Sequence, residues 1–198
     1  MAGTICDSAA GYLSRLSDTI RRIDAASVDR LAELLYSAWR ERRRVFIFGN
    51  GGSALTASHM VCDFLKTASV DGQPRLQVFG LADNAGITTA IGNDISYDDV
   101  FRFPLSAYAQ AGDLAIAISA SGNSPNLLTA CVWAKENGVK VAALTGFSGG
   151  KLAGLADLHV NVPSDNYGVI EDLHLTVGHI AAQSLRSRLM RECAGAGA

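Results

Sequence analysis

The sequence predicts an α/β fold: a three-layer αβα sandwich of flavodoxin-like type, with a five-stranded parallel sheet and N-terminal helices. Two observations support this prediction. Five short, continuously apolar runs occur along the 198 residues, and stretches with helical spacing separate them. Such runs are typical of parallel strands covered on both faces, and strand–helix alternation favours right-handed crossovers. No repeat or linker divides the chain, so we expect one domain over residues 1–198.

The first 42 residues predict two helices. Apolar residues recur at helical spacing between positions 12 and 23, and again between positions 28 and 38, where Ser27 could supply the N-cap. A sheet of five strands is too small to bury the apolar faces of both helices in addition to the helices that follow. We therefore expect residues 1–42 to form contacts in a symmetric oligomer.

The alternation of strands and helices begins after residue 44. The predicted strands are 45–49, 78–81, 114–118, 139–144 and 158–162. The predicted helices among and after them are 54–68, 99–109, 126–136 and 170–191. In sheets of this kind ligands bind beyond the carboxyl ends of the strands, so the loops that follow the strands are the first candidates for a site.

Composition and charge exclude several classes of protein. Hydrophobic residues make up 48% of the chain, charged residues 18%, and the formal net charge is −2, which does not fit a disordered chain. The near-neutral balance predicts no nucleic-acid partner. The sequence contains no run of about 18 apolar residues, so we expect no membrane-spanning helix. Residues 1–22 lack the apolar core of an export signal, so we expect a cytoplasmic protein.

The cysteines and two of the histidines predict ordinary structural roles. The four cysteines form no CxxC pair, and we expect reduced, mostly buried thiols. We expect His174 at the surface or in an interface, and His159 in a structural role within a strand.

Two glycine- and serine-rich loops follow predicted strands and open predicted helices. They are GNGGS at 49–53 and SASGNS at 119–124. Each puts backbone N–H groups and short hydroxyls at a helix N-terminus, where the dipole favours an anion. Either loop alone could be a capped turn, and neither fits the P-loop or dinucleotide motif. Together they favour a ligand with a phosphate and several hydroxyl groups.

Histidine and carboxylate side chains recur on two predicted helices. His59 and Asp63 lie four residues apart and share a helix face. That pair suits a metal site, an acid–base pair or a surface hydrogen bond. On the last helix, His179 follows Glu171 and Asp172, and helix geometry slightly favours Asp172 as the partner of His179.

These motifs resemble the sugar isomerase (SIS) family, and within it the branch that isomerises phosphorylated heptoses. The resemblance covers essentially the whole chain, including 92–94, 144–146 and 149–151. It implies an aldose–ketose isomerase of heptose biosynthesis, converting sedoheptulose 7-phosphate into glycero-manno-heptose 7-phosphate through an enediol or enediolate. Two other functions stay open. One is a non-catalytic SIS module that binds a phosphosugar or a protein, and the other is an isomerase of another sugar phosphate.

The resemblance also implies a homotetramer with shared active sites and roles for particular residues. Asp63 would be the base and His179 the acid. One zinc ion per subunit would be held by His59, Asp63, Glu171 and His179, so the resemblance favours Glu171 over Asp172. The substrate-binding residues would be Asn50, Gly51, Gly52, Ser53, Asp94, Ser119, Ser121, Gly122, Asn123, Ser124 and Glu171.

Three positions depart from the family pattern. Asp63 replaces the glutamate proposed as the base and is one methylene shorter. Glu171 replaces a glutamine, and its extra negative charge should tighten divalent binding while weakening Lewis acidity. Ala120 replaces a threonine, which removes one hydroxyl from the phosphate side. Two imidazoles and two carboxylates still form a suitable zinc set.

Overall fold

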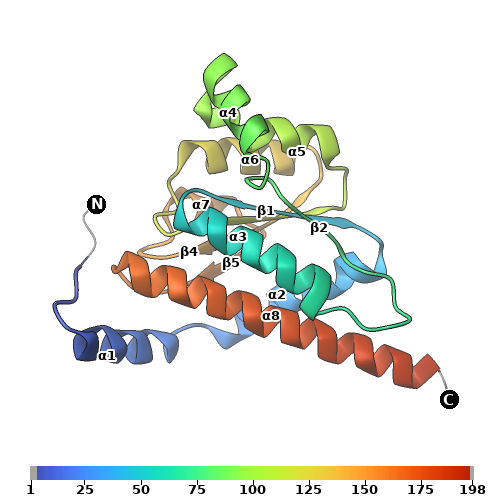
Figure 1. Ribbon diagram of the computed structural model, residues 1–198, viewed down its shortest axis with the longest axis horizontal. Coiled ribbons are helices and arrows are strands. Elements are labelled where there is room, and N and C mark those ends of the chain that lie inside the picture. Colours follow the sequence, from blue (N-terminus) through green and yellow to red (C-terminus); the bar gives the residue numbers. More distant parts are fainter. Residues whose placement is uncertain (1–3, 197–198) are drawn as a thin grey trace.

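The computed structural model describes residues 4–196 and confirms the α/β sandwich with a five-stranded sheet (Figure 1). All neighbouring strands are parallel, in the order β2-β1-β3-β4-β5. This is the flavodoxin-like order, in which the chain reverses its direction of winding between β1 and β3. The strands are β1 (Arg44–Gly49), β2 (Gln77–Gly80), β3 (Leu114–Ser119), β4 (Lys140–Thr145) and β5 (Leu158–Asn161).

Helices cover both faces of the sheet, with α4, α5 and α6 on one side and α2, α3 and α8 on the other (Figure 1). The α-helices are α1 (Ala9–Ile20), α2 (Ala25–Arg40), α3 (Gly52–Cys62), α4 (Ala85–Asp94), α5 (Arg102–Tyr108), α6 (Pro125–Glu136), α7 (Gly150–Leu155) and α8 (Tyr167–Ala196). A π-helical turn follows α3 at Asp63–Thr67, and a 3₁₀ turn precedes α5 at Tyr97–Asp99.

The sheet separates two apolar cores. In β1, Val45 and Ile47 point into the core beneath α2, α3 and α8, whereas Phe46 and Phe48 point into the opposite core. All four side chains have no solvent exposure. Alternation along a strand with both faces buried explains why the sequence shows a continuous apolar run here.

The structure corrects the expected start of the second helix. Asp24, and not Ser27, is the N-cap of α2, and its carboxylate accepts a hydrogen bond from the Ala26 N–H at 3.1 Å. Ser27 lies within the first turn, where its hydroxyl donates to the Asp24 carbonyl at 2.7 Å. Asp24 has the extended backbone of an N-cap residue, so the helix begins at Ala25, three residues before the first residue of the apolar pattern.

Several short elements were not predicted. Helix α4 begins at the Asn84 cap, whose side chain accepts from the Ile87 N–H at 3.0 Å, and α7 is only six residues long. The helix predicted over 54–68 is interrupted. Its α-helical part ends at Cys62, and the Ala68 N–H then bonds to the Asp63 carbonyl at 2.8 Å across a π-turn.

The expectation for the cysteines is confirmed in part. All four thiols are free, but only Cys131 is buried, and Cys62 is exposed. The prediction of mostly buried thiols is therefore wrong, because Cys6 and Cys193 are half-buried and Cys62, at the end of α3, is exposed. Within residues 4–196 no helix has the length and apolar character that crossing a bilayer requires.

The prediction for His174 is wrong as well, since its side chain is completely buried. It lies on the face of α8 that packs against the end of β4, and its Nε2 is 3.0 Å from the Thr145 carbonyl oxygen. A carbonyl only accepts, so Nε2 carries the hydrogen. Nδ1 has no partner among the described residues. His159, half-buried on β5, bonds the Thr145 hydroxyl at 2.6 Å, which fits a structural role.

Burial lowers the pKa of His174 from 6.5 to about 4, which predicts acid sensitivity. Between these pH values the unfolded chain binds the extra proton and the folded protein does not, so stability falls as the pH falls. We expect about 3 kcal/mol of this contribution to be lost on going from above pH 6.5 to pH 4. Urea unfolding at a series of pH values should show a shallower decline for His174→Gln. Parallel declines would contradict the assignment.

Candidate active site

A polar cavity of about 230 Å³ lies beyond the ends of β1 and β3, where the winding of the sheet reverses. We call it the loop pocket. This is the position where open α/β sheets bind ligands. Its lining residues are Asn50, Ser53, Ile118, Ser119, Ala120, Ser121, Ser124, Tyr167 and Glu171.

The first loop reaches the pocket through its glycines and Asn50. A Cβ on Gly49 would lie 2.7 Å from the Ile118 carbonyl oxygen, so only glycine lets β1 and β3 continue side by side into the loop. Gly51 has φ +55° and caps α3. The Asn50 amide is held reciprocally by the Asn126 amide, with both bonds at 2.9 Å.

The second loop is held in place by its own polar groups. The Ser119 and Ser124 hydroxyl oxygens lie 3.4 Å apart, and Ser119 Oγ accepts from the Gly122 N–H at 3.2 Å. Asn123 donates to the Ser121 carbonyl at 2.9 Å and accepts from the Lys151 N–H at 3.0 Å. The amide of Asn123 therefore ties the loop to α7, and the serine hydroxyls face the pocket in a preorganised arrangement.

Glu171, and not Asp172, faces the loop pocket. The Glu171 carboxylate lies over Gly52, where an added Cβ would be 2.5 Å from Oε2. Asp172 turns toward α1 and accepts a hydrogen bond from the Tyr12 hydroxyl at 2.6 Å. Burial and the neighbouring Asp172 charge raise the pKa of Glu171. Asp172 is thus not the partner of His179, because α8 is rotated so that Asp172 meets Tyr12.

The predicted histidines and Asp63 come together where α3 packs beside α8 (Figure 1). The Asp63 Oδ2 atom is 3.4 Å from Nε2 of His59 and 3.4 Å from Nε2 of His179. The two Nε2 atoms are 3.1 Å apart. We call these three residues the His59–Asp63–His179 cluster.

Thr67 orients the carboxylate of the cluster. Its hydroxyl donates to Asp63 Oδ1 at 3.0 Å, which leaves Oδ2 facing the imidazoles. Asp63 is also the first residue of the π-turn, a feature that is frequent at functional sites. Asp63 is mostly buried, with 14% of its side chain exposed, whereas the two imidazoles are about half exposed and open to a ligand.

The cluster has the donor set and dimensions of a zinc site. In a tetrahedral site with ligand atoms about 2.0–2.1 Å from the ion, those atoms lie about 3.3–3.4 Å apart. The three separations in the cluster are 3.1, 3.4 and 3.4 Å. Three protein ligands leave a fourth position for water or substrate, as in catalytic zinc sites.

One predicted metal ligand lies outside the cluster, and one predicted substrate-binding residue lies outside the loop pocket. Among the described residues the group of potential metal ligands contains His59, Asp63 and His179, and Glu171 lies outside it. Asp94 does not line the loop pocket, and its carboxylate accepts from the Asn93 amide at 2.7 Å. Glu171 and His179 are eight positions apart on α8, so the residues that carry the loop pocket and the cluster are about 12 Å apart along this helix.

Four contributors to the site were not predicted. Tyr97 donates to the Asn50 amide oxygen at 3.2 Å, and Asn126 pairs with the same amide. These contacts join segments 47 and 76 residues apart, and no local pattern signals them. Thr67 is four residues after Asp63, so helical spacing could have suggested it. The sequence does not indicate that Tyr167 lines the loop pocket, because its position depends on where α8 begins.

Comparisons with known proteins identify the family of the chain. Residues 10–146 match the SIS domain family. A phosphoheptose isomerase of Chlorobium phaeobacteroides is 37% identical over 171 residues, covering 85% of this chain and 76% of that protein. One from Rhodospirillum rubrum is 37% identical over 175 residues, covering 88% and 90%. The structure of phosphoheptose isomerase GmhA from Neisseria gonorrhoeae superposes with a TM-score of 0.80 at 30% identity, covering 89% of this chain and 97% of that one.

The fold and the loop pocket define an α/β protein of the class that binds its ligand beyond the carboxyl ends of a parallel sheet. The chain belongs to the SIS domain family and, within it, to the family of phosphoheptose isomerases. Both the resemblance and the fold expected from the sequence are confirmed.

Close packing of α3 on α8 at Gly178 predicts that the cluster is sensitive to this residue. A Cβ on Gly178 would lie 2.7 Å from Met60 Cε and 2.8 Å from Met60 Cγ. We expect Gly178→Leu to separate the helices, lower the free energy of unfolding by about 1–3 kcal/mol, and weaken Zn²⁺ binding by roughly tenfold or more.

The matched control is Gly154→Leu on α7, where an added Cβ meets nothing within 4 Å. Zinc titration of both variants at neutral pH provides the comparison. Equal zinc affinity in Gly178→Leu and the wild type would show that this contact does not hold the cluster together.

Proposed function

We propose that this protein is a phosphoheptose isomerase, an aldose–ketose isomerase that converts sedoheptulose 7-phosphate into glycero-manno-heptose 7-phosphate. The observation that carries the proposal is the separation of two unlike sites along α8. The anion-binding loop pocket and the acid–base cluster lie about 12 Å apart. With bonds of about 1.5 Å, an extended seven-carbon sugar with a terminal phosphate is about 10 Å long.

The loops would bind the phosphate end of the substrate. Ser53, Ser119, Ser121 and Ser124 would offer hydroxyls, and Gly51 and Gly52 would supply backbone N–H groups at the start of α3. Gly122 and Asn123 would shape the second loop, because their N–H groups donate to the Ser119 and Ser121 hydroxyls at 3.2 and 3.3 Å. Ser53 and Ser119 are only 5% exposed, so their hydrogen bonds to an anion would be shielded from water. Asn50 and Glu171, which line the loop pocket, would contact the sugar hydroxyls. Asp94 remains a predicted contact, although within one subunit it lies outside the loop pocket. Ala120 is nearly buried against apolar neighbours, so the lost threonine hydroxyl leaves no unpaired polar group.

The cluster would move the protons. Asp63 would remove a proton from C1 while His179 donates one to the C2 carbonyl oxygen, which forms the enediol. Asp63 would then deliver its proton to C2, and His179 would take the proton from the C1 hydroxyl to leave the aldehyde. Each group returns to its starting state, as a general acid and base must. Asp63 lies within reach of His179 despite being shorter than the family's glutamate, since Thr67 holds its carboxylate in place.

We propose zinc as the metal of the cluster, held by His59, Asp63 and His179. With its Nε2 on the ion, His179 would exchange its proton through Nδ1, and Asp63 would act through the carboxylate oxygen that does not bind the ion. The separations among the three donor atoms support this assignment. Bound Zn²⁺ polarises a carbonyl and stabilises negative charge on the adjacent oxygens. Glu171 remains a predicted fourth ligand, and its carboxylate would have to turn from Gly52 toward the cluster.

We also propose a cytoplasmic homotetramer with shared active sites, in which residues 1–198 form one SIS domain. Four free thiols favour a reducing compartment. Leu13 and Ile20 of α1 are 62% and 45% exposed, and Ile180 of α8 is 43% exposed, which supports burial of these residues against other subunits.

Turnover of sedoheptulose 7-phosphate, followed by NMR with zinc supplied, tests the proposed activity. We expect aldose signals to appear with the wild-type protein. Asp63→Ala and His179→Ala should each lower kcat by about 10²–10⁴-fold, the range for a lost acid or base. Asp71→Ala, at an exposed carboxylate outside the site, is the control and should keep full activity.

Other outcomes would identify the competing functions. Phosphosugar binding without turnover would indicate a regulatory SIS module. Turnover of a pentose or hexose ketose phosphate, with none of the heptose, would indicate an isomerase of another sugar. Full activity in Asp63→Ala would contradict the assigned base.

A further inference from the structure

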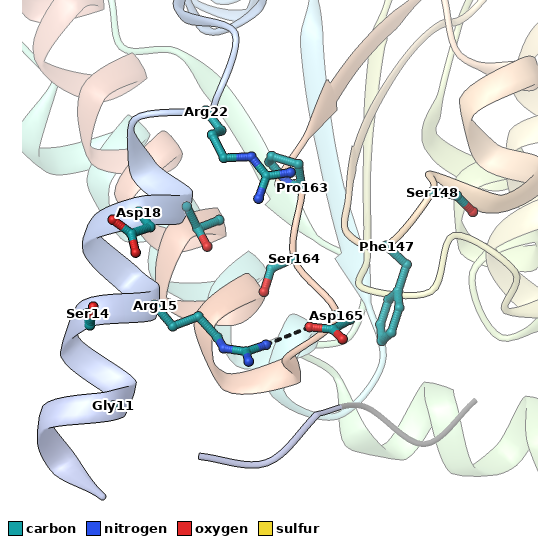
Figure 2. A pocket seen from close by; sticks show the side chains of 11 residues that line it. Gly11, Ser14, Arg15, Asp18, Arg22, Phe147, Ser148, Pro163, Ser164 and Asp165 are labelled. Atoms are coloured by element: carbon teal, nitrogen blue, oxygen red, sulfur yellow. Dashed lines mark hydrogen bonds and ion pairs between the residues drawn. The ribbon is translucent and has the colours of Figure 1, made fainter.

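A second cavity, of about 840 Å³, lies beyond the ends of β4 and β5. We call it the α1 cavity. Its walls are α1, the loop after β4 and the segment after β5 (Figure 2). It opens at the same end of the sheet as the loop pocket but is lined by different residues. Its volume falls in the range of small-molecule sites.

Two guanidinium groups extend into the α1 cavity from α1 and from the residues just after it. Figure 2 shows Arg15 and Arg22 directed toward the 163–165 segment, with the Ser164 hydroxyl between them. Arg15 pairs with Asp165 at 2.7 Å. The Arg22 side chain forms no ion pair with any residue in the described part of the chain.

The charges around the α1 cavity leave Arg22 uncompensated. Asp165 is matched by Arg15, and Asp18 pairs with Arg21 at 3.0 Å. An excess positive charge beside hydroxyl groups is the usual setting for binding a phosphate, which guanidinium groups recognise through paired hydrogen bonds.

An aromatic contact joins the α1 cavity to the loop pocket. Phe147 lines the α1 cavity and has φ +46°, an uncommon conformation for a residue with a side chain. Its ring packs edge-on against Tyr167, with centroids 5.2 Å apart and an interplanar angle of 63°. Tyr167 lines the loop pocket, so this aromatic pair forms part of the wall of both cavities. Strained backbone of this kind gathers at ligand sites.

We propose that the α1 cavity is a second binding site, separate from the loop pocket, for a small phosphate-bearing molecule. Arg22 and Arg15 bind its phosphate together with Ser164, and Phe147 contacts its non-phosphate part. The proposal does not depend on isomerase activity.

Equilibrium dialysis with labelled inorganic pyrophosphate tests the site, using the full-length protein. We expect a binding site that Arg22→Glu weakens by about tenfold or more and that Ser119→Ala, in the loop pocket, leaves intact. Arg21→Glu is the matched control, because Arg21 is the neighbouring exposed arginine and pairs with Asp18. It makes the same change in net charge and should keep the site.

Arg22→Gln, a milder change, should also weaken this site, and thermal melts of each variant establish that the fold is intact. The proposal is overturned if pyrophosphate binding does not depend on Arg22, or if Arg21→Glu weakens it equally. It is also overturned if Ser119→Ala abolishes all binding. The dialysis experiment measures pyrophosphate binding and not turnover. A protein without isomerase activity could therefore still show the second site, so failure of the proposed activity and failure of the proposed second site are distinguishable.

Discussion

The packing of α3 against α8 at Met60 and Gly178 is the constraint on which the candidate active site depends. Met60 is buried, and the absence of a side chain at Gly178 lets it approach the backbone of α8. His59 precedes Met60 and His179 follows Gly178, so this close contact brings the two imidazoles to 3.1 Å from each other. Asp63 completes the cluster from one turn further along, where Thr67 fixes its carboxylate. No polar attraction is needed to bring these elements together, because apolar burial of the two helices already does so.

The sheet supplies the other half of the site. Its winding reverses between β1 and β3, and two loops with glycine and serine leave the sheet side by side at that point. Glycine at position 49 is required by the approach of the Ile118 carbonyl, and Gly52 makes room for Glu171. Helix α8 then passes from the loop pocket to the cluster and sets the distance between them. A rigid helix is well suited to this role, because its rise per residue cannot change without breaking hydrogen bonds.

Much of this arrangement is predictable from the sequence, because its signals are local. All five strands appear as apolar runs, and both loops appear as glycine–serine clusters after them. The spacing of His59 and Asp63 also predicts their meeting on one helix face. Features that depend on long-range packing are not predictable in this way. The rotation of α8 decides that Glu171 faces the loops, that Asp172 meets Tyr12 and that His174 is buried, and partners on other elements set this rotation. The π-turn at Asp63 and the short helices α4 and α7 carry patterns too brief to recognise.

A crystal structure of the protein with zinc and sedoheptulose 7-phosphate tests the central claim most directly. The account predicts phosphate density beside Ser119 and Ser124, a zinc ion held by His59, Asp63 and His179, and the C1–C2 end of the sugar at the cluster. Sugar bound with its phosphate in the loop pocket but its carbonyl end directed away from Asp63 would contradict the account.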